Sequence, residues 1–198
     1  TYTPAEAHIV RQGLAYHEMG HKLYDVLEVY GEWKKDNSST NRADWVANEK
    51  WPPFIVQHFG NLALDGRLEH ALKLDYPFTA ESLDFVNDYW AFYAPTNEMD
   101  LTRYRQFLML FARRVLQLAD FYEFDADVIA LYDEHAEHIK NAIHATSTKE
   151  CLEHTRLFLE AVYPQLLEWA DENEEADKDV DSSPKDNHED TDWLHDDI

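Results

Sequence analysis

The chain has 198 residues, of which 44% are hydrophobic and 14% aromatic, so it is long and apolar enough to fold as a domain with a core. Its formal net charge of −23 excludes nucleic acid as a direct partner, because phosphate contacts need clustered cations. No apolar run of about 18 residues predicts a membrane span, and the single cysteine, Cys151, excludes an internal disulfide and favours a cytoplasmic location.

The first predicted element is a long helix that begins after Thr3 and continues to Gly31. Thr3 is a good N-cap, and Glu6 completes a capping box with it. Gly13 and Gly20 interrupt good helix formers at a cost of about 1 kcal/mol each relative to alanine. Gly20 therefore predicts the close approach of another group, which is either a substrate or the backbone of a crossing helix.

The middle of this helix carries the sequence His17-Glu18-Met19-Gly20-His21, which is an H-E-x-x-H motif. Two imidazoles four residues apart project from one helical face, about 5–6 Å from each other, and suit two corners of a tetrahedral zinc site. Glu18 lies beside the pair, where its carboxylate can accept a proton from a water that zinc activates. The motif predicts zinc ligands at His17 and His21 and a general base at Glu18.

A short connection leads from the first long helix to a second one. Residues 37–41 are predicted to form a loop because they are all Asn, Ser or Thr. A short helix then passes through Trp45 to Trp51. Pro53 can open the second long helix, which is expected to end near Asp75.

Polar residues of this second long helix supply candidates for the third zinc ligand. Asn61, Asp65 and Glu69 follow one another at four-residue spacing and therefore share a helical face. One carboxylate can reach the metal while the other orients a ligand histidine from outside. We favour Asp65 as the ligand, with Glu69 and Asn61 as outer partners or alternative ligands.

Four further helices are predicted in the middle and late parts of the chain. Thr79 and Asp100 are the expected N-caps of the first two, and Ser147 forms a capping box with Glu150 in the last. The four helices cover about residues 79–94, 100–118, 125–145 and 147–170.

The end of the chain differs in composition from the rest. Residues 171–198 contain 13 acidic residues and two lysines and almost no core-forming residue, so they are predicted to be a disordered acidic tail or linker. The alternation of β-branched residues that is typical of strands is nearly absent. We therefore expect an all-α fold with a single helical domain of about six or seven helices over residues 1–170.

Other polar residues are candidates for a second site or for supporting roles. His135, His138 and His144 form a second histidine group, in which a metal site and exposed helical histidines are the alternatives. A peptidase also needs a donor that stabilises the oxyanion opposite the metal. The candidates for this role are Tyr89, Tyr93, Tyr104, His58, Arg103 and Arg105.

Two motifs of the chain resemble a group of bacterial and phage zincin-like metallopeptidase domains: His17-Glu18-Met19-Gly20-His21 and Asn61-Leu62-Ala63-Leu64-Asp65-Gly66-Arg67-Leu68-Glu69. In that group the second helix has the form N-x-x-E-D-x-R-I-E, and here Leu64 stands where the pattern has glutamate. The resemblance implies an acidic linker and a von Willebrand factor A domain downstream, in chains that resemble cobaltochelatase-type subunits working with MoxR-type AAA+ ATPases. The arrangement is also similar to that of gluzincins, whose ligand acid lies four residues before a supporting acid; this likeness favours Asp65.

The sequence favours a zinc-dependent metallopeptidase-like domain that hydrolyses a peptide or protein substrate with a metal-activated water. The alternative is a non-catalytic helical interaction module, with a structural or vestigial metal, in an assembly with a von Willebrand factor A domain and an AAA+ ATPase. In a structural site a fourth protein ligand, such as His70 or His58, would close the coordination shell. A helical scaffold without metal is the third alternative.

Overall fold

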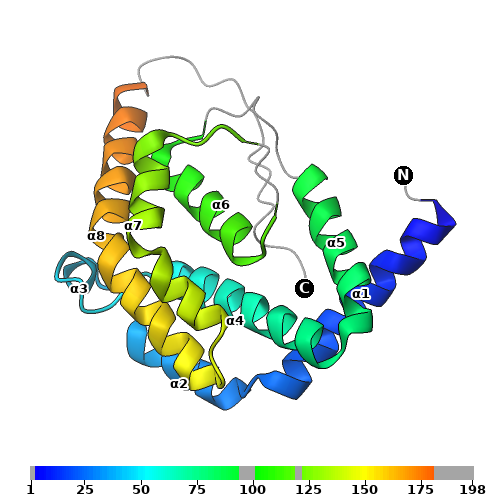
Figure 1. The fold of residues 1–198 in the computed structure, drawn as a ribbon. Coiled ribbons are helices and arrows are strands. Elements are labelled where there is room, and N and C mark those ends of the chain that lie inside the picture. Colours follow the sequence, from blue (N-terminus) through cyan, green and yellow to red (C-terminus); the bar gives the residue numbers. More distant parts are fainter. Residues whose placement is uncertain (1–2, 94–100, 119–121, 181–198) are drawn as a thin grey trace.

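A computed structural model of the chain describes the backbone of residues 3–93, 101–118 and 122–180. It describes the side chains of the same residues, except those of residues 89–93 and 173–180. The described residues form eight α-helices and one short 3₁₀ helix and contain no strand, which confirms the predicted all-α fold. No helix among them combines the length and the apolarity that crossing a membrane requires. The elements are, in chain order, α1 (Pro4–Tyr24), α2 (Leu27–Asn37), α3 (Arg42–Val46), α4 (Pro53–Asp75), the 3₁₀ helix η1 (Pro77–Thr79), α5 (Ala80–Tyr93), α6 (Arg103–Val115), α7 (Ala126–Ile143) and α8 (Thr148–Val180) (Figure 1).

The first predicted helix is divided at Asp25 and Val26, so the prediction of one helix as far as Gly31 is wrong. Asp25 has an extended backbone, and its carboxylate forms an ion pair with Arg67 of α4. The backbone N–H of Val26 donates to the hydroxyl of Thr148 at the start of α8. These tertiary contacts replace helical hydrogen bonds at the junction, and the next helix, α2, continues through Gly31.

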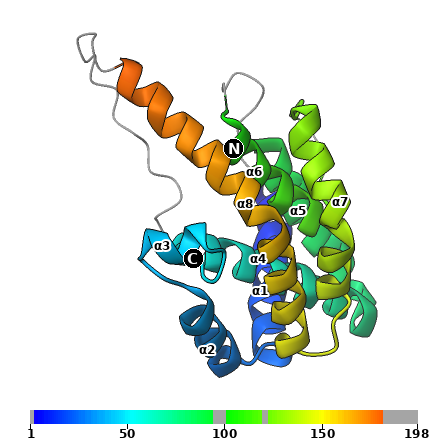
Figure 2. The ribbon, with the colours of Figure 1, turned by 90° about the vertical axis from the view of Figure 1, so that its left-hand side faces the viewer.

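α4 is the central helix of the fold. It packs against α1, α2, α6, α7 and α8, and residues on all of its sides are buried. Its Phe59 lies in the main core with the rings of Phe107 and Phe111 from α6 and Phe158 from α8. This burial explains why the apolar residues of α4 surround the helix and do not form a single stripe. α8 packs along α7, and α2 and α3 lie on its other side (Figure 2).

α1 packs closely against α5 and α4 because of two glycines. A Cβ atom at Gly13 would lie 2.5 Å from the carbonyl oxygen of Ser82 in α5. A Cβ atom at Gly20 would lie 2.7 Å from side-chain atoms of both Leu68 and Leu72 in α4. The structure therefore supports the helix-crossing interpretation of Gly20, and this crossing brings the face of α1 with the two histidines against α4.

The starts of two helices and the length of a third differ from the predictions. The hydroxyl of Thr79 donates to the carbonyl oxygen of Tyr76 at 2.9 Å and so does not cap α5. α6 begins after Thr102, whose hydroxyl accepts the cap hydrogen bond; the predicted cap, Asp100, lies outside the described residues. α3 ends at Val46 and is shorter than expected.

α8 continues to Val180, past the predicted domain boundary at residue 170. The carboxylate of Asp171 forms an ion pair with Arg42 of α3 at 2.5 Å, which supports the helix beyond that boundary. Alanine and glutamate in this stretch are also good helix formers. The rest of the predicted tail, residues 181–198, lies outside the described residues.

Candidate metal centre

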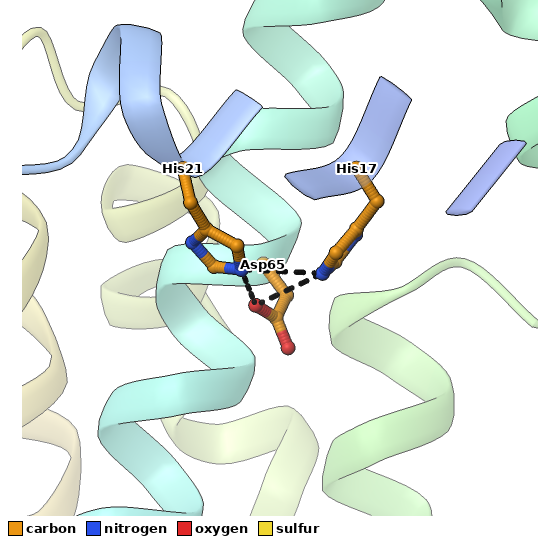
Figure 3. A group of neighbouring side chains, drawn as sticks. All are labelled: His17, His21 and Asp65. Carbon is orange, nitrogen blue, oxygen red and sulfur yellow. Dashed lines mark hydrogen bonds and ion pairs between the residues drawn. The ribbon is translucent and has the colours of Figure 1, made fainter. Parts of the chain in front are cut away.

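Three side chains from two helices meet where α1 crosses α4 (Figure 3). His17 and His21 project from one face of α1, and Asp65 projects toward them from α4. The Nε2 atoms of the two histidines lie 3.2 Å apart. The Oδ1 atom of Asp65 lies 3.7 Å from Nε2 of His17 and 3.3 Å from Nε2 of His21. Among the described residues this is the one group of three or more His, Cys, Asp or Glu side chains that can hold a metal ion.

The three distances between the ligand atoms fit a tetrahedral metal site. Ligand atoms about 2.0–2.1 Å from a common tetrahedral centre lie about 3.3–3.4 Å from one another. The side chains of His17, His21 and Asp65 are 23%, 32% and 21% exposed, so the group is accessible from solvent. Within the described part of the chain the group consists of these three residues, and three protein ligands are the number that catalytic zinc sites use.

His21 is supported from behind by a buried ion pair. Its Nδ1 atom donates to Oδ2 of Asp25 at 2.7 Å. The other oxygen of Asp25 accepts from the guanidinium of Arg67 at 2.6 Å, and the two side chains are only 1% and 4% exposed. The ring of His21 is therefore connected to α4 through two successive hydrogen bonds.

His17 has a corresponding carboxylate on its Nδ1 atom. That atom lies 3.3 Å from Oε1 of Glu69, which is a residue of α4. The second oxygen of Glu69 accepts from the amide of Asn87 in α5 at 2.8 Å and lies 3.7 Å from the ammonium group of Lys73. The structure thus places Asp65 beside the Nε2 atoms of both histidines and Glu69 behind His17.

The surroundings of both histidines favour a positive charge. Hydrogen bonds to Asp25 and Asp65 raise the pKa of His21 to about 10. Burial acts to lower the pKa of His17, but the hydrogen bond to Glu69 and the negative charges of Asp65 and Glu69 outweigh it, and the pKa is raised. A metal cation held by two neutral imidazoles would satisfy the same electrostatic preference.

Two further predicted site residues, Glu18 and Asn61, lie on the two helices that carry the group. Glu18 follows His17 on α1 and is exposed. Asn61 lies one turn before Asp65 on α4, and its amide oxygen accepts a hydrogen bond from the hydroxyl of Tyr30 in α2. Asn61 is therefore seen here as the hydrogen-bond partner of Tyr30.

His58 and His70, the candidates for a fourth ligand, make other contacts. His58 is half-buried, with Nε2 3.4 Å from the carbonyl oxygen of Leu108, and the desolvation of its ring lowers its pKa. The ring of His70 packs edge-on against His144, with the ring centroids 4.4 Å apart. Neither histidine joins the metal group in the described residues, so the structure places no closed four-ligand site there.

The second histidine group does not form a metal site within the described residues. His135 and His138 are half-buried on α7. His144 is the C-cap of α7, and its Nδ1 atom donates to the carbonyl oxygen of Lys140 in the last turn of that helix at 2.7 Å. Of the three histidines only His144 is exposed, so the alternative of exposed helical histidines fits His144 and not the other two.

The candidates for stabilising an oxyanion make other contacts where their side chains are described. Arg103 forms an ion pair with Asp127 at 3.0 Å, and Arg105 is exposed on α6. Tyr104 packs against the main core, where burial raises its pKa to about 12. His58 lies against the carbonyl oxygen of Leu108, and the side chains of the last two candidates, Tyr89 and Tyr93, lie outside the described residues.

Sequence reasoning missed two residues that support the histidines, Asp25 and Asn87. Asp25 follows His21 by four residues, a spacing that brings side chains together on a helix and was a usable signal. Asn87 has no such local signal, because it reaches Glu69 only through the packing of α5 against α4.

Comparisons with protein-family models, with curated proteins and with solved structures found no match. The resemblance to bacterial and phage metallopeptidase domains therefore stays a prediction from two short motifs. Leu64, which replaces the glutamate of that pattern, is buried in the main core. The neighbouring position, Asp65, is the one that faces the histidines.

Proposed function

We propose that this chain is a zinc-dependent metallopeptidase-like domain that hydrolyses peptide bonds. His17, His21 and Asp65 would hold the zinc ion, and Glu18 would act as the general base. The observation that carries the proposal is the triangle of ligand atoms on an H-E-x-x-H helix, with edges of 3.2, 3.3 and 3.7 Å. Three protein ligands with one open position are typical of catalytic zinc sites, whereas structural sites have four.

The roles of the residues follow from their positions. When bound, zinc would lower the pKa of a water molecule and polarise the scissile carbonyl. Glu18 follows His17 on α1 and is exposed. On the H-E-x-x-H pattern we assign its carboxylate to accept a proton from the attacking water and to pass it to the leaving amine. Glu69 would keep the ring of His17 oriented by accepting the hydrogen bond from Nδ1.

Metal analysis of protein purified without added metal tests the ligand set. We expect about one zinc ion per chain in the parent protein and its loss in His17→Ala and Asp65→Ala. His135→Ala is the matched control, because His135 lies outside the metal group, and it should retain the zinc. A chain that binds no metal, or that selects iron, would overturn the proposal.

Glu18→Gln tests the catalytic step separately from metal binding. The variant should keep its zinc and lose peptide hydrolysis by about 10²–10⁴-fold, because the amide cannot accept the proton. Glu28→Gln, which changes an exposed acid in the first turn of α2, should leave the rate unchanged. Hydrolysis of unstructured peptides by Glu18→Gln at the parent rate would show that Glu18 is not the base.

A second candidate function is the non-catalytic interaction module in an assembly with a von Willebrand factor A domain and an AAA+ ATPase. The observation that favours it is the lack of any strand among the described residues, because zincin peptidases align their substrate along an edge strand. In this case the parent protein would bind zinc yet hydrolyse peptides no faster than Glu18→Gln does. Both partners stay predictions.

A further inference from the structure

We propose that Asp25, held by Arg67, is the positioning residue that makes His21 the firmer of the two histidine ligands. This inference rests on the proposed metal site. It predicts that the carboxylate of Asp25, which supports His21, contributes more to metal affinity than the carboxylate of Glu69, which supports His17.

The hydrogen bond to Asp25 selects which nitrogen of His21 is the ligand atom. Nδ1 of His21 donates to Oδ2 of Asp25 at 2.7 Å, so a neutral ring carries its proton on Nδ1. The lone pair of Nε2 is then free for a metal. Nε2 is also the atom that lies 3.3 Å from Oδ1 of Asp65.

Asp25 is itself held in place from several sides. Its Oδ1 atom accepts from Arg67 at 2.6 Å inside the protein. The same nitrogen of Arg67 also donates to the carbonyl oxygen of Tyr24. The hydroxyl of Thr148 accepts from the N–H of Val26 at 3.0 Å and donates to the carbonyl oxygen of Tyr24 at 3.3 Å. The backbone on both sides of Asp25 is therefore tied to α4 and α8, which restricts movement of the carboxylate.

The support of His17 is looser and provides a matched comparison. Its Nδ1 atom lies 3.3 Å from Oε1 of Glu69, whereas Nδ1 of His21 lies 2.7 Å from Oδ2 of Asp25. Glu69 is held by the neutral amide of Asn87 and by Lys73 at 3.7 Å. Hydrogen bonds between charged groups at short distance restrain a side chain more strongly than longer contacts with a neutral partner. Removing the charge of Asp25 should therefore disturb the metal site more than removing that of Glu69.

The test compares Asp25→Asn with Glu69→Gln in the full chain, since each change replaces a carboxylate by an amide of the same shape. Zinc affinity is measured by competition with a chromophoric chelator. We expect it to fall about 10–100-fold in Asp25→Asn and by less in Glu69→Gln. The visible absorption spectrum of bound Co²⁺ should also change in Asp25→Asn, because the coordination geometry is disturbed. The inference would be overturned if Asp25→Asn bound zinc as tightly as the parent does. It would also be overturned if Glu69→Gln bound zinc more weakly than Asp25→Asn does.

A second measurement serves if circular dichroism shows that Asp25→Asn does not fold. Nitrogen NMR of the zinc-loaded parent, labelled at histidine, should place the proton of His21 on Nδ1 and the metal on Nε2. The reverse arrangement would overturn the inference. If the parent chain bound no zinc, both the proposed function and this inference would be overturned. That outcome is separate from the others because it is measured on the parent protein alone.

Discussion

The carboxylates behind the two imidazoles make metal binding depend on the protonation of the histidines. Asp25 and Glu69 accept hydrogen bonds from the Nδ1 atoms of His21 and His17, and the pKa of each histidine is raised. Protons and a metal ion therefore compete for the same Nε2 atoms, because only the unprotonated nitrogen is a ligand.

We predict from this competition that zinc affinity rises with pH. The pKa of His21 is about 10 in the fold, against an ordinary value of 6.5 for histidine. Its imidazolium therefore stabilises the metal-free fold fully below pH 6.5, and that stabilisation is lost as the pH rises toward 10. Within this window zinc must displace the proton, so affinity should rise by up to about tenfold per pH unit. Competition titrations with a chelator of known pH dependence measure this; an affinity independent of pH would contradict it.

Cys151 should be unreactive in the folded protein. The thiol is fully buried in α8, next to the carbonyl oxygen of Ala63, and burial raises its pKa to about 12. Because the thiolate is the reactive species, a thiol reagent should label the native chain very slowly and the chain in denaturant completely. Rapid stoichiometric labelling of native protein at mildly alkaline pH would contradict the buried position.

Among the elements, α1 depends most on close backbone approach. Gly13 faces a backbone oxygen of α5, whereas Gly20 faces the ends of two leucine side chains of α4. A backbone group cannot move without shifting its helix, but the end of a leucine side chain can rotate. The two glycines therefore differ in how much a methyl group would disturb the crossing.

We predict that Gly13→Ala lowers the free energy of unfolding by about 1–3 kcal/mol, because the added methyl group would overlap the carbonyl of Ser82. Gly20→Ala should cost less, since the leucines can adjust and alanine gains helix propensity. Gly31→Ala is the control: no described atom lies within 4 Å of the added Cβ, so a gain of up to about 1 kcal/mol is expected. Urea unfolding at equilibrium measures all three. Equal losses in Gly13→Ala and Gly20→Ala would refute this account.

The molecule as a whole has two packed regions that share α4. The main core joins α4 to α6, α7 and α8, and a small cluster of Leu68, Leu72 and Leu83 joins it to α5, with Tyr16 and Tyr24 of α1 against it. α1 packs mainly against α5 and α4. A metal ion held by residues of α1 and α4 would add a direct link between the smaller region and the central helix.

We predict that zinc stabilises the fold through this link. A ligand that binds only the native state at about 100 times its Kd stabilises it by about 2.7 kcal/mol, which corresponds to a rise in Tm of roughly 5–10 °C for a chain of this size. Thermal unfolding with zinc and with a chelator measures the shift. Asp65→Ala should remove most of it, whereas an equal shift in that variant would indicate that zinc acts elsewhere.

Patterns within short stretches of the sequence were sufficient for much of the fold and for the ligand group. Proline and a turn bounded α4 at Pro53 and Asp75, as the structure has it. The four-residue spacing that pairs His17 with His21 also selected Asp65 and Glu69 as one face of α4, because helical geometry is the same in every protein.

Contacts between distant segments were needed for the rest. The helix break at Asp25 arises because Arg67 and Thr148, 42 and 123 residues further along the chain, satisfy the groups that another helical turn would have used. Asn87 reaches Glu69 only because α5 packs beside α4. A local pattern shows only how residues are spaced along one helix. The contacts that place the supporting groups behind the histidines depend on how several helices pack, and a local pattern does not contain that information.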